Sequence, residues 1–240
     1  MQTGLGEIRI QRELKIMNAD FINTLALTGE LAVVTTILLS VIGLPVAYWL
    51  SYSRFRMKPV FEALVCMPLV LPPTVLGYYL LVAFSPRNGF GSFLERFFDT
   101  RLAFTFEGIV IASVIAGLPF MIQPLQNGFT ALPESYREAA YTLGKSKSET
   151  FFRVLIPNIK PSLITGIALT FAHCIGEFGI VLMVGGNIPG ETRIASIAIY
   201  DEVQALNYKA ANQYSLVLFA VSFVLLILIY SINRNFRLKM

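Results

Sequence analysis

The chain has 240 residues, of which 55% are hydrophobic and 14% charged, and its mean hydropathy is +0.64. These values exclude an ordinary soluble globular protein and indicate an integral membrane protein. The net charge of +4 would suggest nucleic-acid binding in a soluble chain, but membrane topology explains it better here, so no nucleic-acid partner is expected.

Five hydrophobic segments are long enough to cross a bilayer, because a hydrocarbon core of about 30 Å needs about 20 apolar residues. Residues 1–20 are too polar for this and are expected to form a tail or an interfacial helix. The predicted all-α membrane domain covers residues 21–233, and residues 234–240 form a cytoplasmic tail. The expected spans are residues 21–52, 60–84, 104–129, 161–185 and 210–233, with a sixth span left open.

The second predicted span contains Pro68, Pro72, Pro73 and Gly77. Proline removes helix N–H donors, and the freed carbonyls must be satisfied inside the protein or by water. This pattern favours a segment that lines a pathway. The polar connection after it carries a short amphipathic helix that is expected to lie along the membrane surface, with Phe93, Leu94, Phe97 and Phe98 as its apolar positions.

Residues 130–160 are the one long charged segment between hydrophobic runs, and they predict two short helices. Gly144 suits the left-handed stop of the first helix. Ser146 with Glu149 forms a capping box for the second, and Pro157 is expected to end it. In the first helix, Ala139 and Ala140 beside Glu138 leave a surface that suits insertion into a partner's groove.

The spacing of Glu138, Ala139, Ala140, Gly144 and the Val154–Pro157 ending resembles the EAA coupling loop of the permease subunits of ATP-binding-cassette importers. Val154 and Ile156 depart from the usual Ile and Leu but keep the apolar character. The resemblance implies an ATPase-coupling role for Glu138, Ala139, Ala140, Gly144 and Pro157. The alternative is an ordinary amphipathic hairpin in a cytosolic loop.

The fourth predicted span carries His173 and Glu177, which are four residues apart and therefore expected on one helical face. Ionisable side chains at bilayer depth are candidates for a functional site. A hydrogen bond that only fixes packing is the alternative. A rival function from another class, an ion-coupled secondary transporter, would use the pair as a proton relay.

Three segments, residues 68–78, 176–179 and 186–193, look like the molybdate permease of bacterial importers, with tungstate and sulfate permeases as close relatives. His173 departs from the arginine expected there. The resemblance implies a type I importer permease fold and a homodimer with one path at its interface. It also implies two ATPase subunits and an extracytoplasmic oxyanion-binding protein. The path and its gate are expected to involve Pro68, Pro72, Pro73, Gly77, His173, Gly176, Glu177, Gly179 and Gly186.

The chain lacks signatures of chemistry of its own. Gly144-Lys145-Ser146 is not a phosphate-binding loop, because that motif needs glycine at the position of Ala139. ATP and Mg²⁺ are therefore expected on a partner ATPase, with no cofactor or metal in this chain and no enzymatic activity of its own. Cys66 and Cys174 lie inside apolar runs and support neither a disulfide framework nor a metal site.

Lysine and arginine are distributed unequally between the two sides of the predicted spans. Eleven fall in the loop after the first span, the coupling loop and the C-terminal tail, and eight in the other polar segments. The bias predicts an N-terminus outside and a C-terminus in the cytoplasm. The resemblance to bacterial importer permeases implies that the membrane is the bacterial inner membrane. A membrane scaffold is the third possibility, and the many helix-breaking prolines disfavour it.

Overall fold

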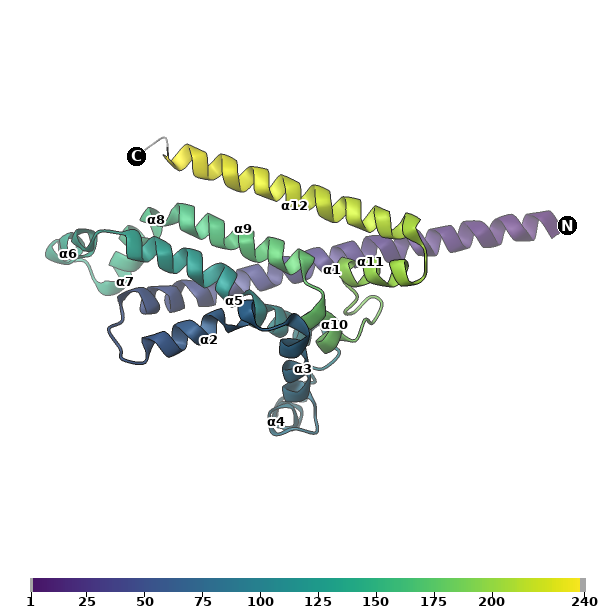
Figure 1. Ribbon diagram of the computed structural model, residues 1–240, viewed down its shortest axis with the longest axis horizontal. Coiled ribbons are helices and arrows are strands. Elements are labelled where there is room, and N and C mark those ends of the chain that lie inside the picture. The colour runs from purple at the N-terminus through teal and green to yellow at the C-terminus, as the bar shows by residue number, and fades with distance from the viewer. Residues whose placement is uncertain (1, 238–240) are drawn as a thin grey trace. The chain divides into compact units, whose positions relative to one another are not determined.

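The computed structural model describes the backbone of residues 2–237 and the side chains of residues 19–229 and 231 (Figure 1). All regular structure in residues 2–237 is helical, which confirms the predicted all-α class. The helices are α1 (Gln2–Tyr52), α2 (Lys58–Val70), α3 (Pro73–Phe84), α4 (Gly89–Phe98), α5 (Phe106–Ala131), α6 (Glu134–Thr142), α7 (Lys147–Thr150), the π-helical turn η1 (Phe151–Leu155), α8 (Ile156–Asn158), α9 (Lys160–Gly176), α10 (Gly179–Gly185), α11 (Ala195–Gln204) and α12 (Tyr208–Arg237).

Three helical segments are long and apolar enough to cross a membrane: Ala19–Tyr52, Phe106–Ala131 and Tyr208–Ile229. Two further candidates are helix pairs with a sharp bend. The pair α2 and α3 bends by 112°, and Lys147–Asn158 with Lys160–Gly176 bends by 76°. If each bent pair is one span, the total is five, the number that the sequence predicts, but the second pair begins at Lys147 in the hairpin and ends at Gly176, so it does not match the predicted span of residues 161–185.

The first helix begins earlier than predicted. Helix α1 is continuous from Gln2, so residues 2–20 extend the first span as a helix with no break at the expected start, Phe21. Residues 7–20 contain neither proline nor glycine, and Glu, Arg, Leu and Lys are good helix formers, so nothing local ends the helix there. The division of the chain at residue 20 stays a prediction.

The fourth predicted span, residues 161–185, is not one helix. Helix α9 ends at Gly176 and α10 begins at Gly179. Phe178 between them has φ −132° and ψ −64°, outside the helical region. Glycine on both sides of the break favours it, since glycine is a poor helix former.

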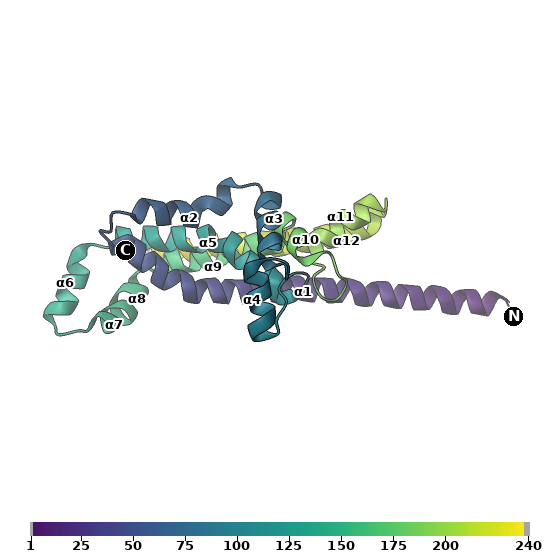
Figure 2. The same ribbon diagram turned by 90° about the horizontal axis from the view of Figure 1, so that it is seen from below.

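The contacts group the chain into two compact units. The first unit comprises residues 2–32, 73–112 and 175–219. Its α11 and α12 pack Ala195, Ala198 and Tyr214 against α1, where the ring of Phe21 lies 4.6 Å from that of Tyr214. Helix α11 starts against α1, because the Ala195 amide donates to Thr28 Oγ1 at 2.8 Å. Helix α10 lies against α3 in the same unit (Figures 1 and 2).

The second unit comprises residues 33–72, 113–174 and 220–237. In this unit, α6, α7 and α8 lie next to the Tyr52 end of α1 (Figure 2). The unit has an apolar core drawn from α1, α5 and the hairpin, which anchors the hairpin to the membrane helices. The core residues are Leu39, Ala47, Leu50, Met121, Ile122, Leu125, Phe129, Leu155 and Ile159.

Candidate functional site

The charged hairpin, residues 130–160, has the two predicted helices with the predicted break. Helix α6 ends in a Schellman-type cap: the Lys145 amide donates to the Ala140 carbonyl at 3.0 Å and the Gly144 amide to the Tyr141 carbonyl at 2.9 Å. Gly144 has φ +75°, a left-handed conformation that glycine adopts without a steric cost.

The second helix of the hairpin starts with the capping box that the sequence predicts. The Glu149 amide donates to Ser146 Oγ at 3.2 Å, and the Ser146 amide donates to Glu149 Oε2 at 3.3 Å. Both bonds satisfy N–H groups that the first helical turn would otherwise leave unpaired. Glu149 also pairs with Lys145 at 3.3 Å, which links the cap to the preceding turn.

Pro157 does not end the second helix, contrary to the prediction. After α7 the chain continues through the π-helical turn η1 and then α8, which includes Pro157 and ends at Asn158. Proline is tolerated there because it occupies the first turn of α8. The turn also alters which side chains face inward: Phe151 packs against the core, whereas Phe152 is 63% exposed.

The exposed side chains of the hairpin mix apolar groups with a carboxylate. We call these exposed side chains the hairpin surface, and they are Tyr136, Glu138, Ala139, Tyr141, Leu143 and Phe152. Leu143 is 79% exposed, although leucine normally lies in a core. Ala140, the third predicted coupling residue, is buried and is not part of this surface. A surface of this kind is typical of a protein–protein contact.

The predicted pathway prolines lie at the break between α2 and α3. Helix α2 ends at Val70, Pro72 lies between the helices, and Pro73 begins α3. The sequence predicts one span over residues 60–84, whereas the structure has two helices with a bend of 112° between them. Pro68 remains inside α2.

Three predicted gate residues come together where α3 meets α10. A Cβ atom on Gly77 would lie 2.9 Å from Met183 Cβ and 3.1 Å from the Ile180 Cα. A Cβ atom on Gly179 would lie 3.1 Å from Pro73 Cβ. Glycine at positions 77 and 179 is therefore what allows the two helices to approach this closely. Whether this contact opens and closes a path stays a prediction.

His173 and Glu177 do not share a helical face, and that prediction is wrong. Helix α9 ends at Gly176, so Glu177 lies in the break that follows, where its carbonyl accepts a hydrogen bond from Ser196 Oγ. The ring of His173 stacks on Phe120 at 4.1 Å. In the part of the chain whose side chains are described, no group of three His, Cys, Asp or Glu residues could hold a metal ion.

The loop after α10 is fixed by polar contacts that sequence reasoning missed. Gly186 ends α10 with φ +68°, and the ring of Phe104 leaves no room for a side chain there. Arg193 Nε donates to Asn187 Oδ1 at 2.8 Å, and Asp201 on α11 accepts from Asn187 Nδ2 at 2.7 Å and pairs with Arg193 at 3.6 Å. No local pattern marks Asp201 as the partner of a residue in the loop.

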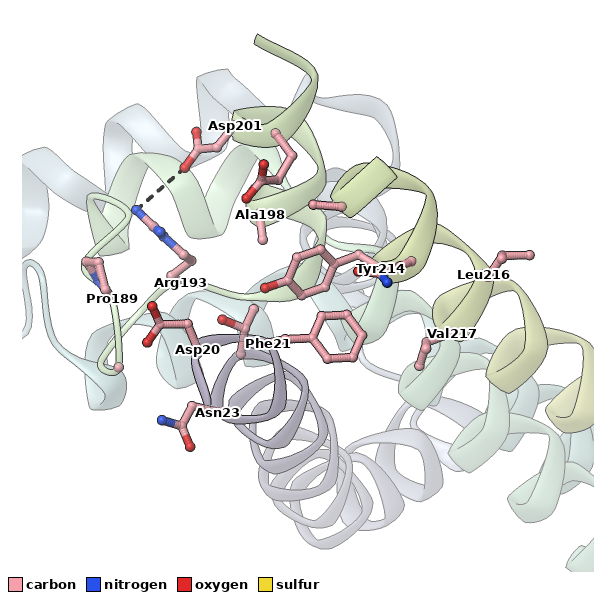
Figure 3. A pocket seen from close by; sticks show the side chains of 15 residues that line it. Asp20, Phe21, Asn23, Pro189, Arg193, Ala198, Asp201, Tyr214, Leu216 and Val217 are labelled. Atoms are coloured by element: carbon pink, nitrogen blue, oxygen red, sulfur yellow. Dashed lines mark ion pairs between the residues drawn. The ribbon is translucent and has the colours of Figure 1, made fainter. Parts of the chain in front are cut away.

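This loop borders a cavity of about 560 Å³ within the first unit (Figure 3). Three carboxylates line it, those of Asp20, Asp201 and Glu202, together with Arg193. Figure 3 shows Arg193 turned toward Asp201, with Phe21 and Tyr214 side by side across the cavity. Arg193 and Asp201, which pair at 3.6 Å, therefore both line the cavity.

We expect Asp201→Ala to free this loop. The side chains of the Arg193–Asp201 pair are about one-third exposed, so after screening the pair stabilises the loop by roughly 1 kcal/mol or less. Without it, trypsin cleavage after Arg193 should accelerate about threefold to fivefold. Limited proteolysis of the purified protein, with mass analysis of the fragments, measures the rate. Glu202→Gln is the matched control, since Glu202 lines the same cavity and bonds Asn207 instead. Equal rates in all three proteins would show that Asp201 does not hold the loop.

Comparisons with known proteins agree with this architecture. Residues 40–240 match the family described as binding-protein-dependent transport system inner membrane component. The chain is 47% identical to the molybdenum transport system permease protein ModB of Azotobacter vinelandii, over 87% of this chain and 92% of that protein. It is 34% identical to the sulfate transport system permease protein CysT of Salmonella typhimurium, over 92% of this chain and 79% of that protein.

Solved structures share the fold. A chain of the MetNI methionine ABC transporter superposes with a TM-score of 0.71 at 18% identity, covering 91% of this chain and 97% of that chain. A chain of a bacterial alginate ABC transporter gives 0.73 at 16% identity, covering 90% and 79%. These likenesses confirm the predicted importer-permease fold. Together with the family match, they lead to one conclusion: the chain belongs to the family of binding-protein-dependent transport system inner membrane components, which are multi-pass membrane proteins.

Proposed function

We propose that the chain is the permease subunit of an ATP-driven, binding-protein-dependent importer, and that its substrate is molybdate. The observation that carries the proposal is the 47% identity to ModB, a protein named for molybdenum transport, over nearly the whole length of both chains. Sulfate is the alternative substrate, supported by the 34% identity to CysT. Both anions are tetrahedral and doubly charged, so the choice between them is a choice within one ligand class.

In this proposal the ATPase is a separate subunit that docks on the hairpin surface. Glu138 and Leu143 support this role, because both are exposed on a hairpin whose shape is fixed by the Gly144 stop and the Ser146 cap. A partner that covers Leu143 removes a large apolar side chain from water, which favours association. ATP and Mg²⁺ bind in that subunit and not in this chain.

The remaining partners are a second copy of the chain, the lipid bilayer and an extracytoplasmic oxyanion-binding protein. Helix α12 supports contact with a second copy of the chain and with the lipid bilayer. Its Leu216, Leu226 and Leu228 are each about half exposed, and an apolar partner surface or lipid would remove them from water. The distribution of lysine and arginine supports a cytoplasmic hairpin and C-terminus, with the N-terminus outside. Pro73, Gly77 and Gly179 at the α3–α10 contact remain the proposed gate.

Reconstitution in liposomes tests the proposal. The chain is purified with its co-purifying ATPase and reconstituted in liposomes. The binding protein and radiolabelled molybdate are then added, and uptake is compared between reactions that differ only in the presence of ATP. We expect uptake that requires ATP and the ATPase subunit, and that excess sulfate inhibits weakly. Strong inhibition by sulfate would assign the sulfate alternative. ATP-independent transport by the chain alone would support the ion-coupled secondary transporter and overturn the proposal.

A further inference from the structure

A cluster of aromatic rings and one arginine joins the hairpin to the last two turns of α1. The Arg137 guanidinium carbon lies 4.5 Å from the ring centroid of Tyr52. Arg137 is held there because its Nη2 also pairs with Glu134 Oε1 at 2.7 Å, one turn earlier in α6. A cation over an aromatic face attracts the ring, and the attraction weakens when either group turns away. The contact therefore depends on the orientation of α6 relative to α1.

Tyr52 also contacts a second element of the same unit. Its hydroxyl donates to the Phe129 carbonyl at 3.1 Å, in the last turn of α5. One turn earlier in α1, the ring of Tyr48 lies edge-on to Phe151 of the π-helical turn at 5.1 Å and to Phe129 at 5.7 Å. The end of α1 thus touches α5, α6 and η1 through two tyrosines.

Adjacent residues of α6 have opposite surroundings. Glu138 is exposed on the hairpin surface, whereas the side chain of Arg137 is only 23% exposed and faces Tyr52. Helices α5 and α9 are joined to the hairpin by the chain itself. Helix α1 is not, so it can follow a displacement of α6 only through side-chain contacts.

We propose that Arg137, Tyr52 and Tyr48 form the joint through which a displacement of α6 moves α1. The inference rests on the proposed function, because the ATPase is what displaces α6. Arg137 and the two tyrosines are positioning residues: they touch no substrate, and they add to the apolar core shared by α1 and the hairpin the contacts that depend on the orientation of α6. Losing the joint separates ATP hydrolysis from transport, whereas losing the hairpin surface separates the ATPase from the permease.

Coupling ratios in the reconstituted complex test the joint. For Tyr52→Leu and for Arg137→Met, molybdate uptake per ATP hydrolysed should fall about fivefold or more, with hydrolysis kept within about twofold of wild type. Tyr52→Phe is the matched control, because it keeps the ring under the guanidinium and removes only the hydroxyl, and it should keep at least about half of the coupling ratio. A variant that is merely less stable loses uptake and hydrolysis in proportion, and its ratio stays unchanged.

A distance measurement tests the joint directly. Spin labels at Arg54→Cys, just after α1, and at Ser148→Cys, an exposed position in α7, report the separation within the second unit, in a Cys66→Ser, Cys174→Ala background. We expect the same distance with and without a non-hydrolysable ATP analogue when the joint is intact. In Tyr52→Leu the distance should change by several ångströms or broaden.

The two possible failures are distinguishable. A coupled wild-type complex in which Tyr52→Leu is equally coupled overturns the joint and leaves the proposed function standing. A wild-type complex that hydrolyses ATP without importing molybdate or sulfate overturns the proposed function, and the joint with it.

Discussion

Replacing Glu138 by alanine is expected to reduce ATP-driven uptake at least about tenfold while the permease stays folded. A charged hydrogen bond across an interface is worth about 1.5–3 kcal/mol, and 1.4 kcal/mol corresponds to a factor of ten. The fold should not suffer, because Glu138 is exposed and makes no side-chain hydrogen bond or ion pair to the residues whose side chains are described. Its carbonyl, which accepts from Thr142 Oγ1, remains in the variant. An uptake assay measures transport, co-purification measures binding of the ATPase, and the melting temperature measures the stability of the fold.

Ser135→Ala is the control for this prediction. It truncates another exposed polar side chain of α6 and should leave uptake and ATPase binding unchanged. If Glu138→Ala transported as well as wild type, coupling would not depend on a contact between the ATPase and this side chain. The coupling role that the EAA resemblance assigns to Glu138 would then be wrong.

The second large effect is expected at the α3–α10 contact. Gly77→Ala places a Cβ atom 3.1 Å from the Ile180 Cα, and a backbone atom cannot turn aside as a side chain can. Overpacking of this kind costs about 1–3 kcal/mol. The melting temperature of the detergent-solubilised protein should fall by several degrees, and uptake should fall with it.

Gly176→Ala makes the same chemical change at another glycine of the predicted gate. No atom lies within 4 Å of a Cβ built at Gly176, so we expect this variant to match wild type in stability. A destabilised Gly176→Ala, or an unaffected Gly77→Ala, would contradict the packing described here.

Local patterns made much of the hairpin predictable. The Gly144 stop and the Ser146–Glu149 box depend on residues within a few positions of one another, and the structure contains both. Pro72 and Pro73 marked the position of the helix break, but not its angle, because proline removes donors without fixing the direction of the next helix.

Contacts between distant segments were not predictable from one sequence. Gly77 and Ile180 are about a hundred positions apart in the sequence but lie close together in the structure. No pattern in either segment indicates that the other is its packing partner. The exposure of Phe152 follows from a π-helical turn, which shifts the order of inward-facing side chains and has no clear sequence signature. The spacing of four between His173 and Glu177 predicts one helical face, and it carries no sign that α9 ends at Gly176.

The length of the first apolar helix has a consequence for its place in the bilayer. Its 34 residues from Ala19 to Tyr52 rise about 51 Å at 1.5 Å per residue. A straight helix tilted by 40°, near the upper limit for membrane helices, crosses a hydrocarbon layer of about 30 Å in about 39 Å. Hydrophobic mismatch therefore leaves at least roughly 12 Å, or about eight residues, standing in the headgroup layer or the water. This helix therefore crosses the membrane and also extends beyond the hydrocarbon layer.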